Sequence, residues 1–207
     1  MIKKRRTFLS LFASGLAFSV LRPSYATSFL TPSQMRGPFY PNNIPLDHDN
    51  NLIRIKNQSG TAIGKVSHLI GQVLNPLSQP IVNAQIEIWQ CDALGRYKHP
   101  RDDGGRDKAF QGYGRTLSGI NGEYSFKTIK PVMYPGRTPH IHMRILSKSS
   151  ELITQIYVKG EPLNNRDFIL NSIHNIAARN SLIIPFVSDP GYPPDELVAK
   201  FNPVILA

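Results

Sequence analysis

The sequence predicts a mainly β protein: a β-sandwich of antiparallel strands with irregular N- and C-terminal arms and at most one or two short helices. From Val66 onward, short apolar runs are separated by clusters of Pro, Gly and Asn, which is typical of a protein built from many short strands. Several runs alternate apolar and polar residues, the period of a strand with one buried face. Only residues 168–179 have apolar residues near helical spacing.

Turn residues mark where the predicted strands end. Residues 75–80 (NPLSQP) predict a turn, and residues 82–88 then alternate apolar and polar side chains, as in a half-buried strand. The dipeptide Asn121-Gly122 predicts a β-hairpin closed by a type I′ turn between the short strands on either side of it. Residues 152–158 form a further apolar run bounded by Gly and Pro, and they predict another strand.

Two of the six histidines stand two residues apart, at His140 and His142, in a predicted strand. Side chains at positions i and i+2 of a strand share one face, about 6.6 Å apart at roughly 3.3 Å per residue. The apolar residues Ile141, Met143 and Ile145 therefore share the opposite face. This arrangement suits two imidazoles that bind one metal ion.

The first 26 residues have the composition of an export signal. Basic residues precede an apolar run over residues 8–21, and the segment ends in small residues at Ala26. The pair Arg5-Arg6 resembles the twin-arginine signal, which carries folded proteins. We expect a bacterial protein that is periplasmic or secreted after removal of residues 1–26; an ordinary secretory signal with a chance arginine pair is the alternative. No apolar run reaches the roughly 20 residues that span a bilayer, so no membrane attachment is expected.

The mature chain is expected to be one domain, with an N-terminal arm over residues 27–65 and a core over residues 66–207 that includes a C-terminal arm. Five of the 24 Lys and Arg and none of the 14 Asp and Glu precede Thr27, so the net charge falls from +10 to +5 without the signal. The remaining basic residues are scattered, which argues against nucleic-acid binding. Cys91 is the only cysteine, which excludes an internal disulfide.

Two tyrosines stand in positions from which they can join the histidines. Tyr134 lies six residues before His140, at the start of a Pro-Gly turn that can fold the phenol back toward the imidazoles. Tyr97 follows another predicted strand, in the turn of residues 89–97. Two Tyr and two His are an unusual set of ligands for a metal ion.

Four blocks of sequence resemble the intradiol ring-cleavage dioxygenases, the family of protocatechuate 3,4-dioxygenase and catechol 1,2-dioxygenase, and they occur in the family's order. They are TPSQMRGPFYP (31–41), IEIWQCDALGRY (86–97), FQGYGRTLSGINGEYSFKTIKP (110–131) and YPGRTPHIH (134–142). The blocks look like the family's N-terminal arm, first-ligand strand, central hairpin and remaining ligands. The short YPGR form resembles that of compact secreted members.

The resemblance implies that Tyr97, Tyr134, His140 and His142 bind a non-haem ferric ion, Fe(III), with Arg137 beside it. It also implies that a catechol binds through both oxygens and displaces Tyr134, whose freed phenolate acts as a general base. Arg137 would stabilise negative charge on the activated ring. With O2, the ring would open between its two hydroxylated carbons to give a cis,cis-muconate-type diacid.

The chemistry of the residues agrees with this implication. A phenol with a pKa near 10 is a poor ligand at neutral pH unless a strongly charged ion stabilises the phenolate, and Fe(III) does so better than a divalent ion. The motif contains no Asp or Glu for a site of two His and one carboxylate, which would favour Fe(II). Zinc usually takes Cys, His and carboxylate ligands.

Several alternatives stay open at this point. A periplasmic transthyretin-like binding module would share the strands without catalysis, and the catecholic substrate could be catechol, protocatechuate, hydroxyquinol or a plant phenol. Arg36 stands where an acidic residue is common, which leaves substrate choice open. Some relatives pair two related subunits, so a homo-oligomer and a second subunit are both compatible with the chain.

Some residues have a functional and a structural interpretation. Residues 37–40 could form a pocket wall or merely pack against the sandwich, and Gln111, Tyr113 and Arg115 could border the pocket or support the strands. The remaining four histidines are interpreted as ordinary surface or loop residues; they are His48, His68, His99 and His174.

Overall fold

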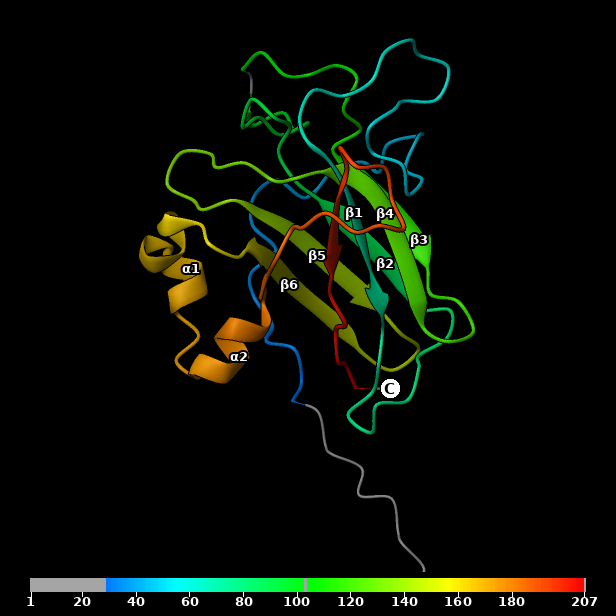
Figure 1. Ribbon diagram of the computed structural model, residues 1–207, viewed down its shortest axis with the longest axis vertical. Coiled ribbons are helices and arrows are strands. Elements are labelled where there is room, and N and C mark those ends of the chain that lie inside the picture. Colours follow the sequence, from blue (N-terminus) through cyan, green and yellow to red (C-terminus); the bar gives the residue numbers. More distant parts are fainter. Residues whose placement is uncertain (1–28, 103, 207) are drawn as a thin grey trace, which may run out of the picture.

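The computed structural model describes residues 29–102 and 104–206, and it consists of two stacked β-sheets with short helices at one side (Figure 1). One sheet has three strands in the order β4-β1-β8, and the other has five in the order β3-β2-β5-β6-β7. The strands are β1 (Val66–Gln72), β2 (Gln85–Trp89), β3 (Tyr113–Leu117), β4 (Glu123–Ile129), β5 (His140–Leu146), β6 (Glu151–Val158), β7 (Ile183–Ile184) and β8 (Leu197–Lys200). The predicted mainly β sandwich is confirmed.

Most neighbouring strands are antiparallel, as predicted, but the sheet edges differ. β8 pairs parallel with β1, and β7 pairs parallel with β6. The predicted C-terminal arm thus contains a strand, β8, whereas residues 29–65 are irregular apart from one bridge at Asn51. The boundaries of the predicted domain remain a prediction.

The core lies between the two sheets and follows the alternation of the strands. Ile86 and Ile88 of β2 point into it, as do Ile141, Met143 and Ile145 of β5, and all five are fully buried. Because alternate residues of a strand face opposite sides, the intervening residues of β2 and β5 lie on the outer face of the five-stranded sheet. The two histidines of β5 are therefore outside the main core, as the sequence predicted.

The predicted hairpin at Asn121-Gly122 is wrong, although a turn forms there. β3 pairs with β2 and β4 pairs with β1, so the two strands belong to different sheets. The N–H of Gly122 donates to the carbonyl of Gly119 (3.0 Å), and Gly122 has a φ of +74°. Asn121 has no positive φ, which a type I′ turn requires. The dipeptide marks a connection between the sheets.

The predicted helix over residues 168–179 is two short helices, α1 (Phe168–Asn171) and α2 (Ile176–Ser181), preceded by a 3₁₀ turn, η1 (Pro162–Arg166). The side chain of Asp167 accepts from the N–H of Leu170 and caps α1, and that of Asn175 accepts from the N–H of Ala178 and caps α2. Ile176 is 64% exposed, so the apolar pattern does not form one buried stripe.

The N-terminal arm crosses the outer face of the five-stranded sheet. The N–H of Gln34 donates to the carbonyl of Ile153 (2.7 Å), and the hydroxyl of Thr154 donates to the carbonyl of Pro32 (2.8 Å). The predicted export signal, residues 1–26, lies outside the described residues. In the part of the chain that the structure describes, no helix is long and apolar enough to cross a membrane.

Candidate metal centre

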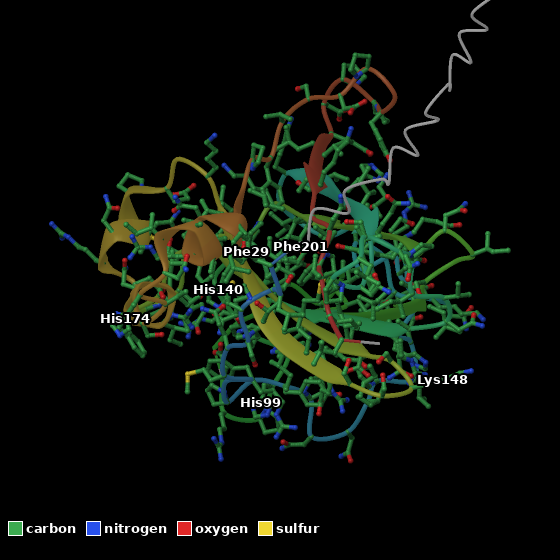
Figure 2. The ribbon with its side chains drawn as sticks, turned by 90° about the horizontal axis from the view of Figure 1, so that it is seen from below. Phe29, His99, His140, Lys148, His174 and Phe201 are labelled. Carbon is green, nitrogen blue, oxygen red and sulfur yellow. The ribbon has the colours of Figure 1, made fainter. Side chains whose placement is uncertain are left out.

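The two histidines of β5 converge on one point. Their Nε2 atoms lie 3.1 Å apart, and their ring centroids lie 4.7 Å apart. Both side chains are buried. Figure 2 shows His140 at the opposite end of the β5–β6 pair from Lys148, on the side of the molecule where the helices lie.

Hydrogen bonding assigns the ring nitrogens. Nδ1 of His140 lies 2.7 Å from the carbonyl oxygen of Thr138, which can only accept, so Nδ1 carries the proton and Nε2 has a free lone pair. His142 stacks on Trp89 of β2 with centroids 4.8 Å apart and planes 5° from parallel. The second bond on Nδ1 thus orients His140, as in many metal sites. Nδ1 of His142 has no hydrogen-bond partner among the described residues, and stacking on Trp89 orients that ring.

Both imidazoles are neutral at neutral pH. Burial, and then the charge of Arg137, lowers the pKa of His140 to about 3. Burial also holds the pKa of His142 well below its usual value, and the neighbouring His140 and Arg137 lower it further. Neutral imidazole is the form that binds metal ions.

Tyr97 reaches the same space from the turn after β2. Oδ1 of Asp92 accepts from the N–H groups of Leu94 and Arg96 (both 2.9 Å), which closes that turn. The ring centroid of Tyr97 lies 6.2 Å from that of His142. Its buried hydroxyl has no hydrogen-bond partner among the described residues, and burial raises its pKa well above the usual value. A cation beside it would satisfy the oxygen and stabilise the phenolate.

Tyr134 is the one candidate ligand that is half-buried. Its turn is closed by the N–H of Arg137, which donates to the carbonyl of Tyr134 (3.0 Å), and Gly136 has a φ of +82°. Its ring centroid lies 5.6 Å from that of His140 and 5.4 Å from that of Tyr97. The structure therefore brings together all four side chains that the sequence singled out as ligands.

The fifth predicted residue, Arg137, is buried beside them. Its Nε donates to Oδ2 of Asp167 (2.8 Å), its Nη2 to Oε1 of Gln155 (2.6 Å) and its Nη1 to the hydroxyl of Tyr134 (3.4 Å). A cavity of about 260 Å³ opens here, lined by residues of the 133–138 turn and of the 163–167 segment. Arg137 thus joins the candidate ligands to a space that is accessible from outside.

The N-terminal arm packs against the candidate ligands through residues 37–40. Phe39 stacks on Tyr97 with centroids 4.4 Å apart. A Cβ on Gly37, which has a φ of +73°, would lie 3.3 Å from Cε1 of His142. The hydroxyl of Tyr40 donates to the buried carboxylate of Glu87 (2.8 Å) and anchors the arm.

The hydrogen bonds of Gln111 and Arg115 favour the structural interpretation of these residues. The buried amide of Gln111 donates to the carbonyls of Asp49 (3.1 Å) and Tyr113 (2.7 Å), and Arg115 contacts His48 (2.9 Å). Tyr113 packs edge-on against Tyr40 in the aromatic cluster. His99, interpreted as a surface or loop residue, is a buried loop residue that lies against the edge of Phe39.

The donor set fits Fe(III). Among residues 29–102 and 104–206, no cluster of three His, Cys, Asp or Glu could hold a metal ion. A metal at this position would therefore use the phenols. Burial raises the pKa of Cys91 to about 12, and its thiol donates to the carbonyl of Val132 (3.6 Å). Two phenolate oxygens, one of them from the unpartnered hydroxyl of Tyr97, and two imidazoles form the donor set. These donors match a trivalent ion better than zinc or Fe(II).

Sequence reasoning missed two residues of the centre. Gln155 lies opposite His142 in the register of β5 and β6, and Asp167 precedes α1. Neither belongs to the motif blocks. The alternation of residues 152–158 could have placed Gln155 on the polar face, but no sequence signal connects Asp167 to Arg137.

Comparisons with known proteins point to one family. The protein-family model described as "Dioxygenase" matches residues 35–204. The chain is 38% identical over 156 residues to the protocatechuate 3,4-dioxygenase beta chain of Burkholderia cepacia, covering 70% of this chain and 65% of the relative. It is 27% identical over 175 residues to the catechol 1,2-dioxygenase of Candida albicans, covering 75% and 54%. The chain thus spans less than two thirds of the length of these relatives.

Solved structures share the fold. The dioxygenase domain of a dioxygenase–carbohydrate-binding fusion from Streptomyces sp. SirexAA-E matches with a TM-score of 0.65 at 24% identity, covering 86% of this chain and 99% of that one. The hydroxyquinol 1,2-dioxygenase of Pseudomonas putida DLL-E4 matches with a TM-score of 0.66 at 20% identity, covering 86% and 67%.

Fold and site together define a β-sandwich with a candidate metal centre of two phenols and two imidazoles on the outer face of one sheet. The chain belongs to the dioxygenase family, among the intradiol ring-cleavage dioxygenases.

Proposed function

We propose that this protein is a non-haem Fe(III)-dependent intradiol dioxygenase that uses O2 to cleave a small catecholic ring between its two hydroxylated carbons, giving a cis,cis-muconate-type diacid. One observation carries the proposal. The side chains of Tyr97, Tyr134, His140 and His142 surround one space, with the two Nε2 atoms 3.1 Å apart and the Tyr97 hydroxyl unpartnered among the described residues. Two phenols and two neutral imidazoles form a donor set that suits a ferric ion better than zinc or Fe(II).

These four residues would hold the iron. The two imidazoles are neutral, and two phenolates would offset two of the three charges of Fe(III) and favour that oxidation state. When bound, Fe(III) withdraws electron density from a coordinated catechol and makes the ring reactive toward O2.

Tyr134 has the position of a proton acceptor for the substrate. It is half-buried, whereas Tyr97, His140 and His142 are buried, so an incoming diol reaches Tyr134 first. A tyrosinate released from the metal is basic enough to take a proton from a catechol hydroxyl. The 3.4 Å contact from Nη1 of Arg137 to the Tyr134 oxygen places a permanent positive charge at the same point.

Arg137 would stabilise the negative charge that develops on the ring and its oxygens. Its guanidinium is buried, where electrostatic interactions are stronger than in water. It also lines a cavity of about 260 Å³. The relatives carry names for protocatechuate, catechol and hydroxyquinol dioxygenases, so the proposal extends to the catecholic diol and not to its ring substituents.

Export and assembly belong to the proposal as well. The residues of segment 1–26 support export of the folded protein to the periplasm or medium by the twin-arginine route, which replacement of Arg5-Arg6 by two lysines would block. Two relatives are named as beta and alpha chains, which supports either a homo-oligomer or a complex with a related subunit. The mass of the purified protein in solution distinguishes a self-assembling chain from one that needs a partner.

The test is the visible absorption spectrum of the purified protein, recorded with its iron content before any substrate is added. A broad phenolate-to-Fe(III) charge-transfer band at one iron per chain, altered by catechol in the absence of air, is the expected result. O2 uptake and a muconate-type product should then follow on admission of air. A protein that stays colourless after loading with iron in air would contradict the proposal and favour the transthyretin-like binding module.

A further inference from the structure

Asp167 is a buried carboxylate outside the candidate ligand set. Its side chain has 0% exposed area, and it accepts hydrogen bonds from two directions. Arg137 donates from Nε at 2.8 Å and from Nη2 at 3.4 Å. The backbone N–H groups of Thr138 (3.1 Å) and Leu170 (2.9 Å) donate as well. Asp167 thus ties the turn that carries Arg137 to the first turn of α1.

The cap of α1 does not by itself require a carboxylate at position 167. The cap needs one acceptor for the N–H of Leu170, and Ser or Asn would supply it equally well. Burying a charge is costly unless it is paired and fully hydrogen-bonded. Burial acts to raise the pKa of Asp167, but the hydrogen bonds from Arg137 and Leu170 outweigh it and lower the pKa. The site therefore holds an ionised carboxylate at neutral pH, directed at the guanidinium.

Asp167 and Gln155 together leave Arg137 one orientation. A guanidinium is a planar fork, so a carboxylate on Nε and Nη2 fixes its plane. Oε1 of Gln155 accepts the other bond from Nη2 at 2.6 Å. The remaining nitrogen, Nη1, then faces the hydroxyl of Tyr134. Without the carboxylate, the side chain could rotate, and Nη1 would no longer be held toward the candidate metal centre.

We propose that Asp167 is a positioning residue for the ring-cleavage reaction, which acts by holding Nη1 of Arg137 toward the substrate. This inference rests on the proposed function and extends it. The hydrogen bonds of the Asp167 carboxylate go to Arg137 and to two backbone N–H groups, and none goes to a candidate ligand. Its effect on turnover therefore passes through Arg137.

The primary variants are Asp167→Asn and Asp167→Ser. Both side chains are good caps, so α1 keeps its start, and neither holds the guanidinium by charge. We expect kcat to fall about 10- to 100-fold, the cost of misplacing a positioned catalytic group, with KM changed less than about threefold because Arg137 acts on developing charge. Iron content should not change and the charge-transfer band should remain, since the four ligands are intact.

A matched control is Asp189→Asn. Asp189 also accepts from a backbone N–H, that of Gly191 (3.0 Å), and from a cation, Lys200 (3.2 Å), but it lies on the surface away from the centre. Its replacement should leave kcat and KM at the wild-type values. The control shows whether the loss of kcat comes from removing any hydrogen-bonded carboxylate or specifically from removing that of Asp167.

A double-mutant cycle distinguishes a positioning role from a purely structural one. In an Arg137→Gln background, Asp167→Asn should cause no further loss of kcat, because the residue through which it acts is gone. The same cycle in the metal-free protein gives a readout independent of activity. The free energy of unfolding, measured with urea, should fall less in the double variant than the sum of its falls in the two single variants. Each single variant leaves one buried charge unpaired, whereas the double variant leaves none.

Three outcomes would overturn the inference: wild-type kcat in both Asp167 variants, an undiminished effect of Asp167→Asn in the Arg137→Gln background, or additive losses of stability in the metal-free cycle. Additive losses in the last measurement would overturn the inference even if one variant folds too poorly for kinetics. The wild-type protein separates this inference from the proposed function. If the wild type is active and the Asp167 variants are equally active, only the positioning role of Asp167 is contradicted. If the wild type is inactive and colourless, both the positioning role and the proposed function are contradicted.

Discussion

The ring of Phe39 lies almost parallel to that of Tyr97, with centroids 4.4 Å apart and an angle of 13° between the planes. Phe39 belongs to the N-terminal arm and Tyr97 follows β2, so the contact fastens the arm over the candidate metal centre. The stacked ring limits the positions that the Tyr97 phenol can take.

Replacing Phe39 with Ala should destabilise the protein by about 1–3 kcal/mol, through lost apolar burial and lost ring stacking. The phenol of Tyr97 would then have more freedom, so iron should dissociate faster into a chelator. Urea unfolding and chelator release followed at the charge-transfer band measure the two effects. The control is Phe29→Ala, because Phe29 lies in the same arm but is 81% exposed. Equal behaviour of the two variants would contradict a role for the arm.

Gly37→Ala should reduce iron content by displacing His142. The new Cβ would lie 3.3 Å from Cε1 of that ring, in addition to the strain of a side chain at a φ of +73°. Gly160→Ala is the control, because Gly160 has a φ of +88° and a Cβ added there would meet no atom within 4 Å. Both variants should lose about 1 kcal/mol of stability from backbone strain. Only Gly37→Ala should lose iron, as measured by metal analysis of the purified proteins.

Tyr97→Phe should separate metal binding from folding. The Tyr97 hydroxyl is buried without a partner in the described part of the chain, so its removal from the metal-free protein should leave stability unchanged or raise it by about 1 kcal/mol. The same variant should lose iron and the charge-transfer band. Tyr124→Phe is the opposite case, because its hydroxyl donates to the carbonyl of Phe201 (2.8 Å) and the variant should lose about 1 kcal/mol while keeping iron. A metal-free Tyr97→Phe protein that is markedly less stable would show that the hydroxyl has a structural partner.

Acid should destabilise the metal-free protein through its two buried histidines. The folded-state pKa of His140 is lowered to about 3 and that of His142 is also lowered, whereas both titrate near 6.5 when unfolded. Above pH 6.5 neither state is protonated, but below it only the unfolded chain binds the protons. The free energy of unfolding should therefore fall between pH 7 and pH 5, by about 2 kcal/mol from His140 and by a further amount from His142.

Urea unfolding at several pH values measures this slope. His140→Gln should reduce the effect, because one of the two buried titrating groups is gone. His174→Gln should leave it intact, since His174 is exposed. A pH slope that does not change in His140→Gln would contradict the assignment of the acid effect to this histidine.

Much of the candidate centre could be predicted because its chemistry lies in short motifs. The i, i+2 spacing of His140 and His142 fixes a shared face on any strand, and the structure places both imidazoles there. Tyr134 reaches the centre through a tight turn that Arg137 closes. Such relationships are local, so the sequence carries them directly.

Relationships between distant segments were not predictable in the same way. Asn121-Gly122 predicts a turn correctly, but which sheet each flanking strand joins depends on long-range pairing. Asp167 meets Arg137 across 30 positions of the chain, and Phe39 meets Tyr97 across the fold. No periodicity or spacing encodes these contacts, since they arise only when the arm and the helical segment pack on the sheet.

The candidate ligands are unequally buried, so the centre is exposed on the side of one ligand only. Tyr97, His140 and His142 are sealed between the sheet and the arm, whereas Tyr134 stands half-exposed on its turn. Under the proposed function, an ion being loaded, a chelator removing it and an arriving diol would all reach the centre past the phenol of Tyr134. A molecule bound at Tyr134 would then slow both metal loading and turnover.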